Sequence, residues 1–374
     1  MVYTPHVVSI TSVLRRDEEV FYNTFAENIE HKKNIEVSSG SDKLIVCVDE
    51  SPNFYDDKKV KRFLKIQEIL VEKKVKAKFI LDSVFLDESL ISASEDVVFI
   101  NLWRLLSQKL VSKQQNNKKV NFEKKLGLFL PGRIDRFNRL VLLKKLFERN
   151  ILNKIIWSCH YSLEELNAFT NVRNTWFIDY TDKQWQAFIQ VLPNVLDIQN
   201  FNKDYFFGCG FPFNHKLYEE TIFSIVSESD VEHYARLDYG PATISEKTWK
   251  AMLNYHPFIL VGNKGSVSKL EKWGYKTFRE YMLDPNYNDI ESPHKRINTT
   301  AKNIENFAKN LIDNKVMVDN DVKHNIQLCK KHCQNEKQML FNFFSQYNTN
   351  LGFGVLDDIL LGLIKANPLL KVKN

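Results

Sequence analysis

Charged and polar residues follow two apolar runs in the stretch 221–278, at places where they could bind an anion and hydroxyl groups. Ser227 and Glu228 come directly after the first run, and Glu246 and Lys247 open a predicted helix that leads to the second run. A carboxylate at such a place can accept hydrogen bonds from the hydroxyl groups of a sugar or ribose. A lysine in the first turn of a helix adds its charge to free main-chain N–H groups, which suits a phosphate.

The simpler interpretation of Glu246 and Lys247 is that they belong to a helix cap at Ser245. A lysine in the first turn, however, opposes the helix dipole, so helix propensity alone would not place one there. An anion bound at that helix end would remove the penalty. We therefore keep Glu246 and Lys247 as candidate binding residues.

Arginines near residue 135 form a second group with suitable chemistry. Arg133 follows the predicted strand KLGLFLPG, and Arg139 lies in the predicted helix 135–149, with Arg136 as a further candidate. A guanidinium presents a fork of N–H donors that fits a diphosphate at two points, better than an ammonium does. The alternative is that these arginines lie on the surface beside a loop.

The elements that must position these residues form an alternating pattern. The stretch 221–278 predicts a strand, a loop, a helix, a second strand, a glycine turn and another helix, which is a βαβ unit and the start of the next. Ligands bind beyond the carboxyl ends of the strands in an open parallel sheet. The apolar runs 43–49, 76–82 and 96–103 predict a second parallel sheet earlier in the chain.

Length and composition favour more than one domain. At roughly 100–200 residues per domain, 374 residues with a hydrophobic fraction of 44% indicate two cores. The polar stretch 112–122 is the best linker, so we expect one domain over 1–120 and a second over 121–315. Helices predicted at 298–314 and 318–344 lead to a third segment, 316–374, which would pack back across the domains.

Two blocks of the sequence resemble a known family. The block SEKTWKAMLNYHPFILVGNKGSVSKLEKWGYKTF, from Ser245, and the weaker block LPGRIDRFNRLVLLKKLFERNILNKIIWS, from Leu130, look like the donor domain of fucosyltransferase-like glycosyltransferases of bacteria and phages. The resemblance spans about half the chain. It implies an α/β fold of GT-B type, with two Rossmann-like domains that face a cleft and are closed by C-terminal helices. In such a fold the domain over 1–120 would lie on the acceptor side, and the domain over 121–315 would bind the nucleotide-sugar donor.

The resemblance also implies roles for the candidate residues. Arg133 and Arg139 would face the phosphates of a nucleoside-diphosphate sugar, Glu246 would hold sugar or ribose hydroxyls, and Lys247 would hold a phosphate. Glu228 occupies the position of the family's acidic residue, although Ser227-Glu228-Ser229 replaces the family's Phe-Glu-Asn. The implied reaction moves a sugar from a nucleotide-sugar donor to a glycan or other hydroxyl acceptor.

The catalytic base is the least constrained part of the prediction. An inverting transfer needs a group that takes the proton of the acceptor hydroxyl. Family members draw this group from the N-terminal half, where Asp49, Glu50 and Asp82 lie at predicted strand ends. A retaining mechanism would not need it, and the sequence does not choose between the two.

Metal and cofactor chemistry is not expected. No DxD motif lies in a strand context, so the transfer would not depend on Mg²⁺ or Mn²⁺. A zinc site is a weaker alternative, since its four candidates lie along one predicted helix and cannot all converge on one ion. These candidates are His324, Cys329, His332 and Cys333.

Charge, cysteine usage and hydropathy limit the compartments and partners that the sequence allows. Five scattered cysteines fit a reducing cytoplasm, and no apolar run approaches the roughly 18 residues of a membrane helix. No signal peptide is expected at the N-terminus. The net charge of +6 permits DNA as an acceptor, as in phage base glycosylation, without requiring it. The other alternative is a degenerate glycosyltransferase fold with a structural or carbohydrate-binding role.

Overall fold

The chain divides into two compact units, each built on a parallel sheet. Unit 1 comprises Met1–Leu105, Phe207–Phe211 and Cys333–Asn374, and unit 2 comprises Leu106–Phe206 and Pro212–His332. The computed structural model describes residues 6–9, 44–49, 64–65, 67–68, 71, 76–82, 97–101, 104–105, 107–108, 120, 122, 125–132, 137–159, 183–192, 194, 215–228 and 244–345. The expected domain boundaries after residues 120 and 315 stay predictions.

In the described part of unit 1, the sheet contains four parallel strands in chain order. They are β1 (His6–Ser9), β2 (Leu44–Asp49), β3 (Lys76–Asp82) and β4 (Val97–Ile100). Each pairs with the next in parallel register. The apolar runs therefore correctly predicted a parallel sheet in this half of the chain, and the bounds of β3 agree with the predicted run.

The sheet of unit 2 is also parallel, but its strands do not follow chain order. The strands β5 (Lys125–Gly132), β6 (Ile155–Cys159), β7 (Thr221–Ser227) and β8 (Phe258–Val261) are arranged as β6-β5-β7-β8. The chain moves outward from β5 to β6 on one side and from β7 to β8 on the other. The strand order therefore reverses between β5 and β7, which is the kind of position where ligands bind in open α/β sheets.

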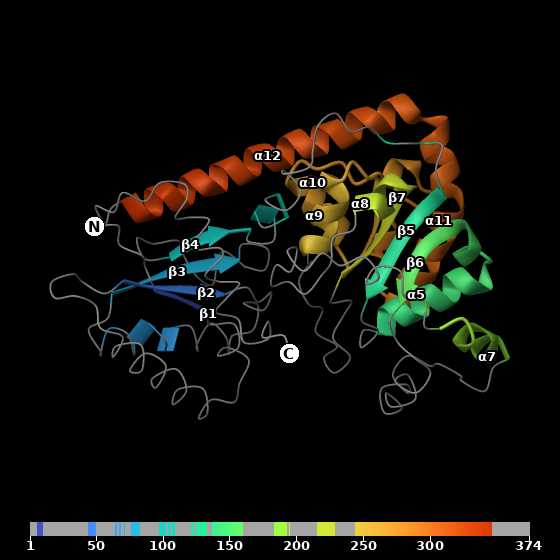
Figure 1. Cartoon of the computed structure of the whole chain (residues 1–374), viewed down its shortest axis with the longest axis horizontal. Coiled ribbons are helices and arrows are strands. Elements are labelled where there is room, and N and C mark those ends of the chain that lie inside the picture. The colour runs from blue at the N-terminus through green and yellow to red at the C-terminus, as the bar shows by residue number, and fades with distance from the viewer. Residues whose placement is uncertain are drawn as a thin grey trace. The chain divides into compact units, whose positions relative to one another are not determined.

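Helices cover both faces of the unit 2 sheet. Because parallel connections are right-handed, two connections that run in opposite directions place their helices on opposite faces. The helix α5 (Phe137–Glu148) follows β5, and α9 (Glu246–Leu253) follows β7. Figure 1 shows the sheet between α9 with α10 (Ser266–Lys272) and the pair formed by α5 and α11 (Pro293–Asp313).

The central strand β7 is buried along its whole length, as expected for a parallel strand that is covered on both faces. On one face the ring of Phe223 packs edge-on against Phe307 of α11, with ring centroids 5.1 Å apart. Gly127 lies opposite Phe223 in β5. A Cβ atom at this glycine would lie 2.9 Å from the ring, so only glycine leaves room for the aromatic side chain.

The strand β8 lies at the edge of the sheet, and a tyrosine covers its outer side. The hydroxyl of Tyr287 donates to the main-chain oxygen of Leu260 (3.0 Å) and accepts from the N–H of the same residue (3.1 Å). Tyr287 is itself buried. A single side chain therefore satisfies two main-chain groups that an edge strand would otherwise leave without a sheet partner.

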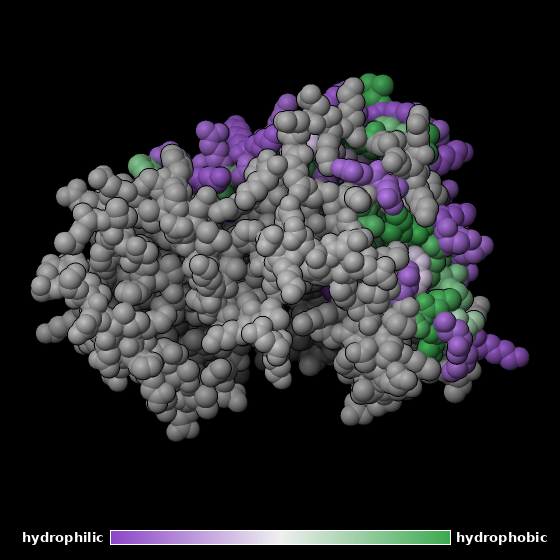
Figure 2. All heavy atoms as spheres, in the orientation of Figure 1, coloured by the Kyte–Doolittle hydropathy of each residue, from purple (hydrophilic) through white to green (hydrophobic). Residues whose placement is uncertain are grey.

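Two long helices close the described part of the chain. The helix α11 begins at Pro293, with Ser292 as its N-cap, and α12 spans Lys315–Ser345. Both were predicted, with later starts at 298 and 318. Hydrophilic side chains cover much of the exposed surface of α12, along the top of Figure 2. Among the described residues, no helix combines the length and apolar character that a bilayer crossing requires.

The remaining elements of the described chain are short. They are α7 (Lys183–Ile189), α8 (His215–Glu219) and the 3₁₀ turns Leu152–Lys154, Arg279–Tyr281 and Tyr287–Asp289.

Candidate functional site

The last residue of β7 and the residue after it send their side chains to opposite faces of the sheet. Successive side chains of a strand alternate between the two faces, so Ser227 points to one side and Glu228 to the other. The hydroxyl of Ser227 accepts a hydrogen bond from the side-chain amide of Asn138 in α5 (3.2 Å). The carboxylate of Glu228 meets the N-terminus of α9. The end of β7 therefore joins the first turns of two helices.

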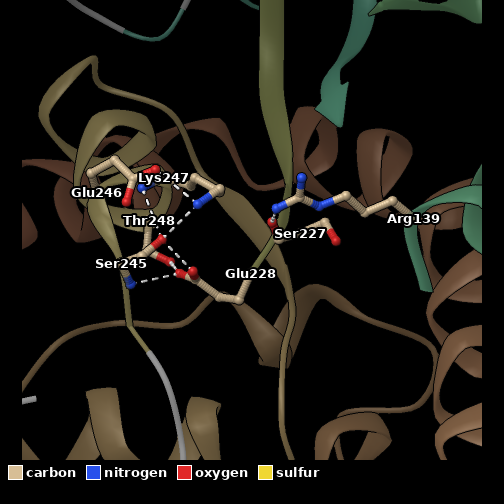
Figure 3. A network of polar contacts seen from close by, with 7 residues as sticks. All are labelled: Arg139, Ser227, Glu228, Ser245, Glu246, Lys247 and Thr248. Atoms are coloured by element: carbon tan, nitrogen blue, oxygen red, sulfur yellow. Dashed lines mark hydrogen bonds and ion pairs between the residues drawn. The ribbon is translucent and has the colours of Figure 1, made fainter. Parts of the chain in front are cut away.

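Arg139 reaches the same strand end from α5. Its guanidinium donates to the main-chain oxygen of Ser227 at 3.5 Å, and the side chain is buried. The described part of α5 begins at Phe137, and Arg139 lies near this end, where a cation opposes the helix dipole. The predicted start at 135 lies outside the described residues. In Figure 3 Arg139 approaches Ser227 from one side, and the residues of α9 lie on the other side.

Glu228 is fully buried, and protein donors contact both of its carboxylate oxygens. One oxygen accepts from the main-chain N–H of Ser245 (2.9 Å) and from the hydroxyl of Thr248 (2.6 Å). The other accepts from the hydroxyl of Ser245. Burial raises the pKa of Glu228 above its ordinary value, and the nearby positive charge of Lys247 opposes this rise.

Ser245 is the N-cap of α9, as the sequence predicted. Its main chain is extended, and its hydroxyl oxygen accepts from the N–H of Lys247 (3.4 Å). The same oxygen accepts from the ammonium of Lys247 (3.1 Å). The cap thus holds the beginning of the helix and also a cationic side chain of its first turn (Figure 3).

Glu246 and Lys247 form an ion pair at the N-terminus of α9. The ammonium lies 2.8 Å from a carboxylate oxygen, and the two side chains are 19% exposed for Lys247 and 5% for Glu246. Burial alone would raise the pKa of Glu246, but the charges of Lys247 and Lys250 outweigh it and lower the pKa below its ordinary value. The pKa values of Glu228 and Glu246 are therefore shifted in opposite directions, although both side chains lie at the N-terminus of α9.

The turn after β8 packs against the same strand end. A Cβ atom at Gly262 would lie 3.0 Å from the hydroxyl oxygen of Ser266 and 3.7 Å from Cγ of Glu228, so glycine permits this close packing. The hydroxyl of Ser266 is buried without a hydrogen-bond partner among the described residues. The side chain of Asn288 accepts from the N–H of Val267 (3.0 Å) and so caps the first turn of α10.

The candidates of the N-terminal half lie at one edge of the unit 1 sheet. Asp49 and Asp82 are the last residues of β2 and β3, which are parallel neighbours, so their main chains end on the same side. Their side chains lie outside the described part of the structure. Glu50 and Arg133 fall outside the described residues altogether.

The candidate zinc ligands have other contacts in the structure. His332 lies 2.8 Å from the hydroxyl of Tyr275, and the ring of His324 lies 2.9 Å from the main-chain oxygen of Gly274. Cys329 and Cys333 are buried and form no disulfide, and the thiol of Cys333 donates to the main-chain oxygen of Arg104 (3.8 Å). In the described part of the chain, no three His, Cys, Asp or Glu side chains gather in a way that could hold a metal ion.

Sequence reasoning missed several residues of this cluster. Thr248 and Asn138 carry no signal of their own, because a threonine or asparagine near a helix start is common. For Ser227 and Glu228, the alternation of side chains between the two faces of a strand could have predicted that they face different helices. The partner helix of each residue depends on the strand order, which the pattern of apolar runs does not contain.

The arrangement joins cations from the first turns of two helices to carboxylates at one strand end. Arg139 and Lys247 carry positive charge, and Lys247 is the more exposed of the two. Such a group can bind an anion that also carries hydroxyl groups. Comparisons with models of known protein families, with curated proteins and with solved structures find no match for this chain.

Proposed function

We propose that this chain is a glycosyltransferase that uses a nucleoside-diphosphate sugar, of the two-domain GT-B kind. Unit 2 would bind the donor, and unit 1 would present the hydroxyl acceptor. One observation carries the proposal: the strand order of unit 2 reverses between β5 and β7, and the polar cluster lies at the carboxyl end of β7. Nucleotide ligands of open α/β sheets bind at such reversals.

The charges of the cluster suit a diphosphate. Arg139 and Lys247 lie near the beginnings of two different helices beside one strand end, where the helix dipoles also favour an anion, so their side chains could engage a diphosphate. Arg133, which follows β5 in the sequence, would add a third cation. These groups would stabilise the negative charge that develops on the departing nucleoside diphosphate.

Glu246 suits the sugar or ribose of the same donor. Its pKa is lowered, so it is ionised over the physiological pH range and acts only as a hydrogen-bond acceptor. A hydroxyl group is the natural partner of such an acceptor. Because Glu246 lies beside Lys247 in the sequence, one helix turn would hold both a phosphate and a hydroxyl of the donor.

The acceptor would react in unit 1. Asp49 and Asp82 end two neighbouring parallel strands, and Glu50 follows the first of them. One of these carboxylates would take the proton of the acceptor hydroxyl in an inverting transfer. A retaining transfer would proceed without it.

Calorimetric titration with UDP-sugars, GDP-sugars and the free diphosphates tests the proposal. We expect the wild type to bind one base class, and Lys247→Ala and Arg139→Ala to weaken binding about tenfold or more. Lys264→Ala and Lys145→Ala are matched controls, because these lysines are more exposed and pair with other carboxylates. A wild type that binds no donor, or variants that bind as well as it does, would refute the proposal.

A second candidate is a carbohydrate-binding protein that performs no transfer. The observation in its favour is that protein donors already occupy both oxygens of Glu228, and that Glu246 already pairs with Lys247. Incubation with a bound donor and a panel of glycan and DNA acceptors separates the two. Release of nucleoside diphosphate supports the transferase, whereas donor binding without release over many hours supports the second candidate.

A further inference from the structure

The carboxylate of Glu228 is unsuited to direct contact with a ligand. It is fully buried, and the oxygen that faces Ser245 N–H and Thr248 already accepts two hydrogen bonds. Each carboxylate oxygen offers about two lone-pair positions, so this oxygen has no free position. The sequence had suggested Glu228 as a donor-binding residue, and its contacts point instead to an action through Ser245.

The hydroxyl of Ser245 links Glu228 to Lys247. A hydroxyl has one proton to donate and two lone pairs that accept. In the structure its oxygen meets the second oxygen of Glu228, the N–H of Lys247 (3.4 Å) and the ammonium of Lys247 (3.1 Å). The two nitrogen groups are donors only, so the lone pairs must face them and the proton must face Glu228.

The same count favours an unprotonated second oxygen of Glu228, the one that faces the Ser245 hydroxyl. If Glu228 were protonated on its second oxygen, it would donate to Ser245, and the serine oxygen would receive three donors with two lone pairs. With the second oxygen ionised, the serine proton has an acceptor, and the two serine lone pairs face the two donors of Lys247. Donation therefore runs from Lys247 to Ser245 and from Ser245 to Glu228.

We infer that Glu228 is a positioning residue that orients the Ser245 hydroxyl and thereby holds the Lys247 ammonium at the beginning of α9. That the Lys247 ammonium binds a diphosphate rests on the proposed function. That Glu228 and Ser245 hold the ammonium in place does not. An amide at residue 228 removes the constraint, because its NH₂ group can donate to the serine oxygen. The hydroxyl proton then turns toward Lys247, and the ammonium loses an acceptor.

The test measures the NMR signals of lysine Cε groups in the labelled protein without ligand. The signal that disappears in Lys247→Arg is assigned to Lys247. We expect Glu228→Gln and Ser245→Ala to move the Lys247 signal to a similar extent. In the double variant we expect the same shift as in Ser245→Ala alone, because Glu228 acts through the hydroxyl. Ser245→Thr, which keeps a hydroxyl, should restore the wild-type signal.

Thr248→Val is the matched control, because it removes one hydrogen bond to Glu228 without touching the Ser245 hydroxyl. A purely structural role of Glu228 predicts that Thr248→Val and Glu228→Gln act alike on the Lys247 signal. The inference is wrong if Glu228→Gln leaves that signal unmoved, or if its effect adds to that of Ser245→Ala. If Glu228→Gln does not fold, the contrast between Ser245→Ala and Ser245→Thr decides: equal Lys247 signals in these two overturn it.

Inorganic pyrophosphate provides the second measurement. We expect Glu228→Gln and Ser245→Ala each to weaken its binding about tenfold, with no further loss in the double variant. The NMR result stands whether or not a nucleotide sugar binds. Failure of the inference and failure of the proposed function are therefore distinguishable, since donor calorimetry on the wild type tests only the latter.

Discussion

The guanidinium of Arg139 donates a hydrogen bond to the main-chain oxygen of Ser227, although 88 positions separate them in the sequence. The contact joins the first turn of α5 to the last residue of β7. These two elements flank the place where the strand order of the unit 2 sheet reverses. Burying a cation costs free energy unless the cation is hydrogen-bonded, and the hydrogen bond to Ser227 offsets part of that cost for Arg139.

Arg139→Lys is expected to weaken donor binding while leaving the protein folded. Lysine keeps the positive charge but replaces the planar fork of donors with a single ammonium, which grips a diphosphate less well. We expect about a tenfold loss of affinity for the nucleotide sugar, measured by calorimetry. Lys145→Arg on the same helix is the control, and an Arg139→Lys variant with unchanged affinity would contradict the role of the fork.

Tyr287→Phe is expected to destabilise unit 2. The variant removes the hydroxyl that serves both main-chain groups of Leu260 at the edge of the sheet. Leaving buried polar groups without a partner costs about 1–3 kcal/mol each, so we expect a loss of at least that size in the free energy of unfolding. Urea denaturation measures it, with Tyr255→Phe as the control because no hydrogen bond of its hydroxyl occurs among the described residues.

Several elements of the fold could be predicted because their signal is local. The runs 76–82 and 125–132 are bounded by charged residues or glycine, and the structure gives β3 and β5 the same bounds. The cap at Ser245 was likewise predicted from the residues that follow it. Local signals lose precision at helix starts, where capping contacts decide, and α11 accordingly begins at Pro293, earlier than the predicted start at 298.

The strand order and the contacts that depend on it could not be predicted in this way. Which strands pair is decided by burial between segments that lie far apart in the sequence. The strands β5 and β7 are neighbours in the sheet, although β6 lies between them in the sequence. The contact of Arg139 with Ser227 depends on that pairing, because it joins the helix after β5 to the end of β7. The roles of Asp49, Glu50, Asp82 and Arg133 stay predictions.

Arg104→Met is expected to destabilise unit 1 strongly. The guanidinium contacts both carboxylate oxygens of Glu336, and both side chains are buried. Removing one partner leaves a buried charge uncompensated, which typically costs about 3–5 kcal/mol. The double variant Arg104→Met/Glu336→Met should recover part of this loss in urea denaturation. Equal loss in the single and double variants would show that the charge of Glu336 is not the cause.

Glu228 and Glu148 are expected to make the free energy of unfolding depend on pH in opposite directions. Burial raises the pKa of Glu228 from its ordinary value of 4.5, so the folded state holds this proton more tightly than the unfolded state does. The stability from that proton is fully present below the ordinary value and is lost as the pH rises through the folded-state pKa. Glu228→Gln should therefore become more stable relative to the wild type as the pH rises.

Glu148 shows the reverse behaviour and provides the comparison. Burial alone would raise its pKa, but the hydrogen bonds and charges of Lys144 and Lys145 outweigh burial and lower it. Its stabilising effect is present above the ordinary value of 4.5 and is lost as the pH falls through the folded-state pKa. Free energies of unfolding from urea titrations between about pH 2 and pH 8 should thus show Glu148→Gln losing stability relative to the wild type as the pH rises toward the ordinary value, with no further change above it. Opposite slopes for the two variants would support the two environments that the structure shows, whereas slopes of the same sign would contradict one of them.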